Sequence, residues 1–354
     1  MNQNWRAFLA SRSADLSEPS DPTQSGAGSA RFANNSLDLD CALVDLSYLG
    51  LIAIGGPEAE DFLQAQVSND IRELSETHSQ LNSHCSAKGR MIANFRMLRI
   101  EQTMFLLLPR TQLEPLFKRL QMFRLRADVT IDNASDALVC FGILGTCADA
   151  ALTEVFGSLP AADNDMSRAG EAVLIRVPGN IPRYLFIGPP EQASHLWQSA
   201  AAEAVEANVD LWELHDIRAG IPTVLPETSD AFVPQMANMH LIDGVSFTKG
   251  CYTGQEVVAR MQYLGKLKRR MYVAEVNTDS APRPGDLLSV PGSKSEQAPG
   301  RIVNVRQIES GRYALLVVVE IRSAEGGEVR LASADGDGPL LSLQEPPYGF
   351  PVQT

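Results

Sequence analysis

The sequence lacks most features that mark exported, membrane-spanning or metal-binding proteins. No apolar run approaches the roughly 20 residues that cross a bilayer, and the first residues lack the basic-then-apolar pattern of a secretion signal. The five cysteines include no Cys-x-x-Cys pair, and their odd number predicts neither a zinc framework nor a disulfide scaffold. We therefore expect a reduced, cytoplasmic protein without a metal site or a membrane partner.

Basic residues are in the minority, and the common catalytic motifs are missing. Thirty Lys and Arg against 43 Asp and Glu give a net charge of −13, which disfavours adhesion to nucleic acid or anionic membranes by bulk charge. We find no His-Glu-x-x-His pair, Gly-rich phosphate loop or dinucleotide fingerprint. The motifs of hydrolases, kinases and dehydrogenases are therefore absent, although 354 residues with 44% hydrophobic content allow about two globular domains.

The composition changes twice along the chain. Residues 1–36 contain one short helical stretch, at 5–11, followed by a Ser-, Pro- and Gly-rich tract, and we interpret them as a flexible leader. Helical and strand patterns then alternate through residues 37–268. From 269 to 354, short strand patterns separated by Pro and Gly predict a small all-β barrel or sandwich.

The most informative motif is Lys-Gly-Cys-Tyr-Thr-Gly-Gln-Glu at 249–256. Thr253 and Glu256 have the spacing of a capping box, which predicts that a helix begins here. Cys251 then lies just outside a helix N-terminus, where the macrodipole and the Lys249 ammonium would lower the pKa of the thiol. A small buried residue in a tight turn is the other interpretation of Cys251, and the local residues favour neither.

Two further features have two interpretations each. Trp212 lies in a helical pattern, where core packing is favoured over stacking on a flat ligand. A dense positive cluster follows the motif, and it either binds an anionic ligand tail or RNA phosphates or forms a solvated helix end. Its members are Arg260, Lys266, Lys268, Arg269 and Arg270.

The octapeptide at 249–256 resembles the signature of the YgfZ family, which are bacterial folate-binding proteins associated with iron–sulfur cluster maintenance and tRNA modification. Supporting matches lie at 62–67, 84–90, 218–222 and 232–238, so the resemblance covers about 40–350. The family is similar in fold to the T protein of the glycine cleavage system. The resemblance implies an α+β fold: two interwoven lobes, the second at about 137–207, and a C-terminal β-barrel domain at 269–354 around a central folate channel.

The same resemblance implies roles for particular residues. Tetrahydrofolate would lie in the channel, against Trp212, which matches the family's folate-contacting tryptophan. A second aromatic contact of the family falls at Leu49, with Tyr48 beside it. The other candidate folate contacts are Arg218, Gln255 and Glu256. Cys251 matches the functional thiol, with Lys249 as its neighbour.

The T protein uses an acidic residue that has no counterpart here. The matching stretch, 88–94, contains no carboxylate, and none follows before Glu101. Because such a group typically contributes 10²–10⁴-fold, we do not expect a classical aminomethyltransferase. The resemblance predicts a cytoplasmic folate-binding accessory protein for iron–sulfur enzymes, including those that modify tRNA, with possible tRNA contact through 266–270. The alternatives are a folate-dependent aminomethyl or methyl transferase and a tRNA-binding adaptor.

Overall fold

The computed structural model describes residues 1–17, 26–263, 265, 267–291, 298–333 and 338–351. The chain divides into two compact units, and each unit is built from separate stretches of sequence. Unit 1 comprises Met1–Leu63, Ile71–Gln80 and Phe95–Glu213, and unit 2 comprises Gln64–Asp70, Leu81–Asn94 and Leu214–Thr354. This division differs from the sequence prediction, in which the first boundary falls after residue 36 and the last near residue 268.

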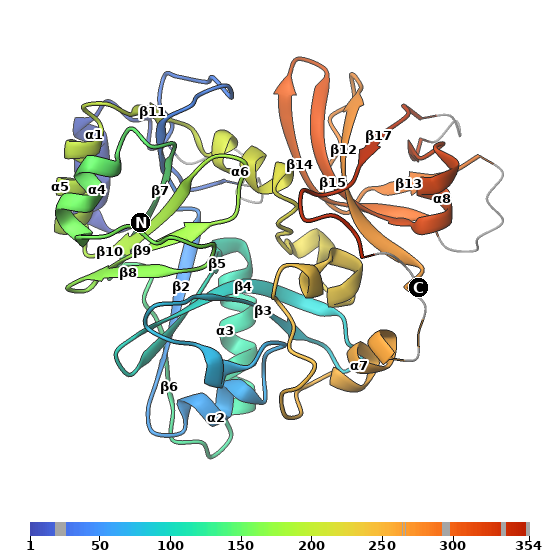
Figure 1. Cartoon of the computed structure of the whole chain (residues 1–354), viewed down its shortest axis with the longest axis horizontal. Helices are drawn as coiled ribbons and strands as arrows, with labels where there is room; N and C mark the ends of the chain where they lie inside the picture. Colours follow the sequence, from blue (N-terminus) through green and yellow to red (C-terminus); the bar gives the residue numbers. More distant parts are fainter. Residues whose placement is uncertain (18–25, 264, 266, 292–297, 334–337, 352–354) are drawn as a thin grey trace. The chain divides into compact units, whose positions relative to one another are not determined.

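Unit 1 contains a six-stranded sheet in the order β11-β1-β7-β10-β9-β8 (Figure 1). Its strands are β1 (Ala42–Asp45), β7 (Val139–Leu144), β8 (Met166–Ala169), β9 (Ala172–Val177), β10 (Arg183–Gly188) and β11 (Val205–Ala207). All the pairs are antiparallel except β1 with β11. The central strands are apolar on both sides, so the sheet is covered on both faces.

Helices cover one face of this sheet. They are α1 (Gln3–Ser11), α4 (Asp149–Phe156) and α5 (Pro190–Ala200). Phe141 and Phe186 point to this face and stack at 4.7 Å between ring centroids. Cys140 and Leu185, one residue away on the same strands, belong to the core on the opposite face, as the two-residue period of a strand requires.

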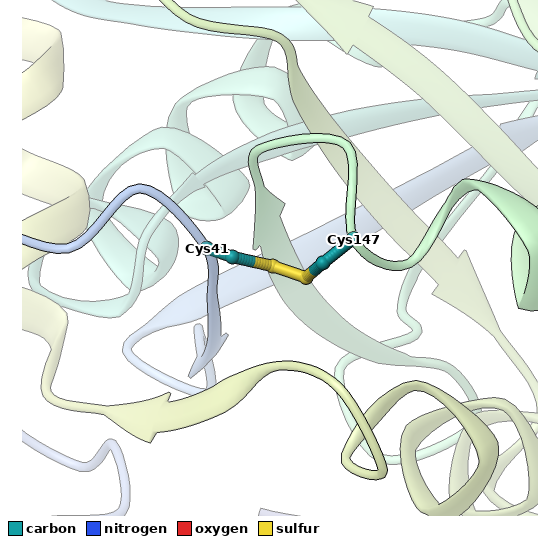
Figure 2. The surroundings of a disulfide bond; sticks show 2 residues. All are labelled: Cys41 and Cys147. Atoms are coloured by element: carbon teal, nitrogen blue, oxygen red, sulfur yellow. A yellow bond between two sulfur atoms is a disulfide. The ribbon is translucent and has the colours of Figure 1, made fainter.

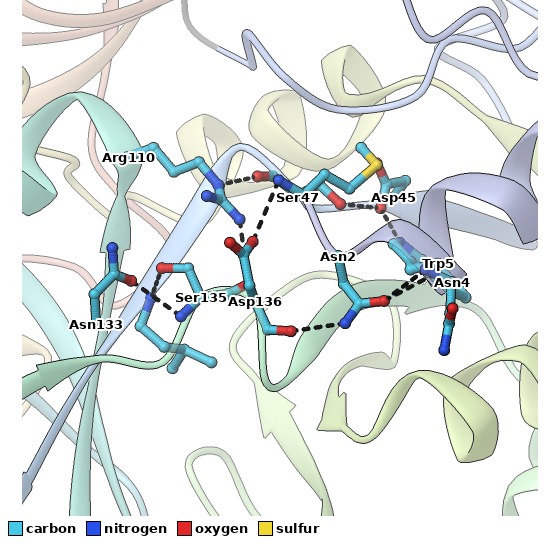
Figure 3. A network of polar contacts seen from close by, with 11 residues as sticks. Asn2, Asn4, Trp5, Asp45, Ser47, Arg110, Asn133, Ser135 and Asp136 are labelled. Atoms are coloured by element: carbon cyan, nitrogen blue, oxygen red, sulfur yellow. Dashed lines mark hydrogen bonds and ion pairs between the residues drawn. The ribbon is translucent and has the colours of Figure 1, made fainter.

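The N-terminal helix is part of this core. Asn2 caps α1 by accepting hydrogen bonds from the Asn4 and Trp5 N–H groups, and Trp5 is fully buried. The Trp5 indole N–H donates to the Asp45 carboxylate at 2.9 Å (Figure 3), which also accepts from the Ala30 N–H and the Ser47 hydroxyl. The helix predicted at 5–11 is confirmed, but it packs within unit 1 and does not stand apart as a leader.

A disulfide joins Cys41 and Cys147, with the two Cα atoms 6.1 Å apart (Figure 2). This bond contradicts the sequence-based expectation of a reduced protein without disulfides, which rested on the odd number of cysteines. The pairing of β1 with β7 supplies the reason. It places Ala42 opposite Leu144, and the two cysteines lie just beyond these strand ends.

A five-stranded sheet has the order β3-β4-β5-β2-β6. Its strands are β2 (Leu49–Gly55), β3 (Gln80–Cys85), β4 (Met91–Ile100), β5 (Thr103–Pro109) and β6 (Thr130–Asn133). Helix α2 (Ala59–Gln64) follows β2, and helix α3 (Arg110–Arg124) packs on β2, β5 and β6. The chain passes between the two units near the start of β3 and again within β4.

Unit 2 contains a curled antiparallel sheet in the order β16-β13-β14-β15-β12-β17 (Figure 1). Its strands are β12 (Arg269–Asn277), β13 (Leu287–Ser289), β14 (Gly300–Glu309), β15 (Arg312–Glu320), β16 (Arg330–Leu331) and β17 (Ser342–Gln344). The predicted β-rich C-terminal region is confirmed, and its first strand begins at Arg269. Helix α8 (Ile321–Gly326) and strands β16 and β17 have no counterpart in the sequence prediction.

Helices and short 3-10 turns complete the chain. Helix α6 (Val209–Arg218) begins in unit 1 and ends in unit 2, and α7 (Gln255–Tyr263) follows the octapeptide. The 3-10 turns are η1 (Ile71–Glu73), η2 (Pro226–Thr228), η3 (Pro234–Ala237) and η4 (Met239–Leu241). Within the described ranges, no helix is both long enough and apolar enough to span a membrane.

Candidate functional site

Lys249 anchors the octapeptide loop to another part of unit 2. Its side chain is buried, and its ammonium donates hydrogen bonds to the carbonyl oxygens of Val67 and Asn69 at 2.7 and 2.6 Å. The ammonium also lies 5.2 Å from the centre of the Tyr252 ring. Hydrogen bonds from a charged donor are stronger than neutral ones, so this lysine fixes the start of the loop.

Two glycines bring the octapeptide against the β3–β4 turn. Gly254 has φ +82° and Gly89 has φ +69°, a region that side chains rarely adopt. A Cβ at Gly254 would lie 2.8 Å from the Gly89 Cα atom and would collide with the Ser86 carbonyl oxygen. Lys88, Gly89 and Arg90 form the turn between β3 and β4, and the packing partner of this turn is the octapeptide.

The helix after the motif begins later than the capping box predicts. The Gly254 carbonyl accepts from the Val258 N–H at 3.4 Å, so Gly254 occupies the N-cap position of α7. Cys251 lies three residues before this position, and its side chain is exposed. The buried-turn interpretation of Cys251 is therefore wrong. The predicted lowering of its pKa stays a prediction.

Two side chains at this site, Cys85 of β3 and Tyr252 of the octapeptide, are buried and hard to ionise. Cys85 is fully buried, and burial, with a smaller effect of the Asp230 charge, raises the pKa of its thiol to about 12. Burial, and to a smaller extent the nearby Cys85, raises the pKa of the Tyr252 hydroxyl above its ordinary value. That hydroxyl has no hydrogen-bond partner among the described residues. Of the three unpaired cysteines that the structure describes, Cys251 is the exposed one.

The other predicted site residues of unit 2 are Gln255, Glu256 and Arg218, and only Gln255 forms hydrogen bonds within the loop. The Gln255 side chain donates long hydrogen bonds, at 3.4 Å, to the carbonyl oxygens of Lys249 and Gly250, and so closes the loop on itself. Glu256 and Arg218 are both exposed, at the start of α7 and the end of α6. Among the residues that the structure describes, Arg218 makes no hydrogen bond or ion pair with the loop.

Trp212, the predicted folate contact, belongs to the core of unit 1. It is 4% exposed, and its ring packs so closely on the backbone of β7 that a Cβ at Gly142 would clash with it. The fully buried Arg183 guanidinium lies 4.8 Å from the ring centre and donates to the Pro178 carbonyl. The sequence does not identify Gly142 and Arg183 as contacts of Trp212, because both residues are far from Trp212 along the chain.

The structure does bring three of the predicted folate contacts together. Tyr48 and Leu49 lie in the same hydrophobic cluster as Trp212. Tyr48 is buried, whereas Leu49 is partly exposed and lines a small pocket with Arg110, Asn2 and other residues of unit 1. Arg110 lines this pocket, and its guanidinium donates hydrogen bonds to the carbonyl oxygens of Ser47 and Ser135 (Figure 3).

The positive cluster after α7 is only partly available to a ligand. Lys266 lies outside the described residues. Arg269 pairs with Glu320 at 3.0 Å, and the Arg270 guanidinium lies 3.7 Å from the centre of the Phe350 ring. Arg260 and Lys268 are exposed. Two of the five cations therefore stabilise the C-terminal sheet.

The stretch 88–94, which lacks the carboxylate of the T protein, contains a residue with a structural role. Asn94 is buried, and its side-chain amide donates to the Pro222 carbonyl and accepts from the Val224 N–H at 2.7 Å each. Both functional groups of this amide are thus used within unit 2. Across the described residues, no group of three or more metal-binding side chains is present, so the prediction of no metal site is not contradicted.

Comparisons with known proteins give a consistent result. Residues 35–211 match the family model described as GCVT N-terminal domain. A protein of Colwellia psychrerythraea named tRNA-modifying protein YgfZ is 31% identical over 301 residues, covering 85% of this chain and 88% of that protein. A Yersinia pestis protein of the same name is 31% identical over 315 residues, covering 89% and 94%. The chain belongs to the YgfZ family.

A solved structure agrees with the fold that the YgfZ resemblance implies. The aminomethyltransferase T of the glycine cleavage system from Bartonella henselae superposes with a TM-score of 0.69, covering 89% of this chain and 87% of that chain. The two sequences are 17% identical, so this likeness concerns the fold alone. The predicted α+β, T-protein-like fold of this YgfZ-family chain is confirmed.

Proposed function

We propose that this chain is a folate-binding accessory protein that supports iron–sulfur enzymes, and through them tRNA modification, with Cys251 as its functional thiol. The proposal takes the tRNA-related activity from the relatives' name and the folate from the family fold. Its partners would be the iron–sulfur enzymes, including those that modify tRNA, and its place would be the cytoplasm.

The exposure of Cys251 on an anchored loop is the observation that carries this proposal. Loops that bear functional groups are typically held by a rigid scaffold, and here Lys249 and Gly254 hold the loop at both sides of the cysteine. A thiol acts as a nucleophile or metal ligand in its thiolate form and only where a reactant can reach it. Cys251 has this access, whereas the Cys85 and Cys140 thiols are buried. We assign Lys249 the role of positioning the loop.

Folate fits the predicted residues only in part. The Trp212 ring is covered by Gly142 and Arg183, so it offers no open face for stacking. The partly exposed Leu49 and the adjacent Arg110, a donor suited to a carboxylate, are the residues of unit 1 that could contact the ligand. We assign no chemical step to folate.

An accessory role fits the residues better than an aminomethyl transfer. The T protein's acidic group has no counterpart in the stretch 88–94, and the Asn94 amide is occupied by backbone groups. An amide also lacks the ionisable proton that general acid–base catalysis requires.

The test is complementation of cells that lack their own YgfZ-family protein. We expect Cys251→Ser to abolish the support of iron–sulfur enzyme activity while leaving the melting temperature and tetrahydrofolate affinity, from calorimetry, close to those of the wild type. Thr248→Ala, at an exposed residue directly before the loop, is the matched control and should complement fully. Full complementation by Cys251→Ser would refute the role of the thiol.

A further inference from the structure

The last two turns of α3 and the two residues that follow them carry a positive surface on an otherwise acidic protein. Lys118, Arg119, Arg124 and Arg126 fall within nine residues, and no acidic residue occurs from Pro115 to Ala127. The whole chain has a net charge of −13. A local cluster of this kind attracts anions over about a Debye length, which is roughly 8–10 Å at physiological salt. We call residues 118–126 the α3 end.

Apolar side chains are exposed among these cations. Helix α3 buries Leu113, Leu116 and Leu120, whereas Met122 is 61% exposed and Leu125 is 85% exposed. Leu125 has φ +48° and ψ −104°, a conformation that a branched side chain rarely adopts. Strained residues of this kind cluster at functional sites, and this one ends the helix with its side chain in solvent.

The cations of the α3 end differ in what they contact. Lys118 pairs with Glu114 at 3.0 Å, and the Arg119 guanidinium lies 5.3 Å from the centre of the Phe123 ring. Arg124 and Arg126 are exposed and take part in no ion pair within the part of the chain that the structure describes. They are thus more accessible to a ligand than Arg269 and Arg270.

We propose that the α3 end is an RNA-contacting surface of this protein, for the phosphates and unpaired bases of a tRNA. The proposal rests on the proposed function, in which tRNA modification is the outcome that the protein supports. Three of the four cations are arginines, whose planar guanidinium matches phosphate oxygens with two parallel hydrogen bonds. Arginine planes and aromatic rings also stack on unpaired bases, and Arg119 with Phe123 supplies both groups.

An anionic membrane is the other surface that cations and exposed aliphatic side chains would suit. The charge of the whole chain favours RNA. A bilayer is an extended negative plane that would also approach the acidic remainder of the protein, whereas a nucleic-acid strand is narrow enough to meet one local patch. Met122 and Leu125 would then cover sugar and base faces of the strand.

Fluorescence anisotropy of a labelled, unmodified tRNA transcript with the full-length protein tests the proposal. We expect the double variant Arg124→Glu, Arg126→Glu to bind about tenfold more weakly or worse, with a slope of log affinity against log salt that is shallower by about two. The matched control is Arg283→Glu with Arg322→Glu, which makes the same charge change at two exposed arginines of unit 2. Circular dichroism confirms that each variant is folded.

The outcomes separate this proposal from its rivals. Equal affinity of the α3-end variant and the control overturns the RNA surface, as does a wild-type protein that binds no tRNA. Loss of binding to phosphatidylcholine–phosphatidylglycerol vesicles by the α3-end variant, with tRNA affinity unchanged, overturns it in favour of a membrane. Complementation by Cys251→Ser would refute the proposed function alone. The tRNA affinity of the α3-end variant would still test whether the α3 end binds RNA.

Discussion

The reactivity of the cysteines depends on burial more than on sequence neighbours. Cys85 and Cys140 are enclosed in strands, and burial raises the pKa of both thiols, that of Cys85 to about 12. A thiol reacts through its thiolate, and the fraction of thiolate at a given pH falls tenfold for each unit by which the pKa rises. Cys251 is exposed, so one residue should account for the reactivity of the folded protein.

We predict that iodoacetamide at about pH 8 labels Cys251 alone in the folded, non-reduced protein. Mass spectrometry of the labelled peptides measures this directly. In denaturant, Cys85 and Cys140 should become labelled as well, because unfolding returns their pKa values to the ordinary range. The variant Cys251→Ser serves as the control and should take up no label when folded; rapid labelling of Cys85 in that variant would contradict the burial argument.

Trp212 provides a second prediction for a single side chain. Replacing Trp212 by Ala should lower the free energy of unfolding by about 3–5 kcal/mol, since the ring packs on Gly142 and beneath the buried Arg183. Trp212→Phe keeps an aromatic ring and should cost less. Denaturant unfolding gives both values, and calorimetry with tetrahydrofolate on the Phe variant shows whether the ring also affects ligand affinity. A cost below about 1 kcal/mol for the Ala variant would mean that the ring is not part of the core.

Among the elements, the contact between α7 and the β3–β4 turn positions the thiol. The Gly254→Ala variant places a Cβ against the Ser86 carbonyl oxygen at a positive φ. We expect it to lower the free energy of unfolding by about 1–3 kcal/mol and to change the alkylation rate of Cys251. Gly250→Ala is the matched control, because no atom lies within 4 Å of its added Cβ. Equal melting temperatures of the two variants would refute the proposed contact.

The N-terminal helix makes a comparable prediction for unit 1. Trp5→Ala should lower the free energy of unfolding by about 3–5 kcal/mol, because the ring is fully buried. In Trp5→Phe most of the packing remains but the Asp45 carboxylate loses one donor, which should cost about 1–3 kcal/mol. Chemical unfolding of both variants measures the difference. A neutral effect of Trp5→Ala would restore the interpretation of these residues as a leader.

These elements also indicate what the sequence can predict. Local patterns predict the N-terminal helix, the helix that follows the octapeptide and the start of the β-rich region at Arg269. They do not predict helix α8 or strands β16 and β17, and they miss the packing of α1. In the candidate site, the octapeptide identifies Cys251 but not the carbonyl oxygens that bind Lys249. Such partners lie about 180 residues away, and no local pattern contains them.

For the whole molecule, the disulfide between Cys41 and Cys147 links two distant parts of unit 1. Closing a loop of this size restricts the unfolded chain, and its loss should lower the free energy of unfolding by about 2–5 kcal/mol. We therefore expect the double variant Cys41→Ser, Cys147→Ser to melt below the oxidised wild type and close to the wild type in reductant. A melting temperature of the wild type that does not respond to reductant would show that the bond contributes nothing.

The interleaving of the two units has a consequence for biosynthesis. Unit 2 takes two short stretches, Gln64–Asp70 and Leu81–Asn94, from the first third of the chain, and its remaining part begins at Leu214. During synthesis, more than a hundred further residues must be added after Asn94 before the rest of unit 2 is present to pack on these two stretches. Fragments that stop near Glu213 would therefore leave apolar strand residues such as Leu81 and Met91 uncovered, and we expect them to aggregate or to be retained by chaperones.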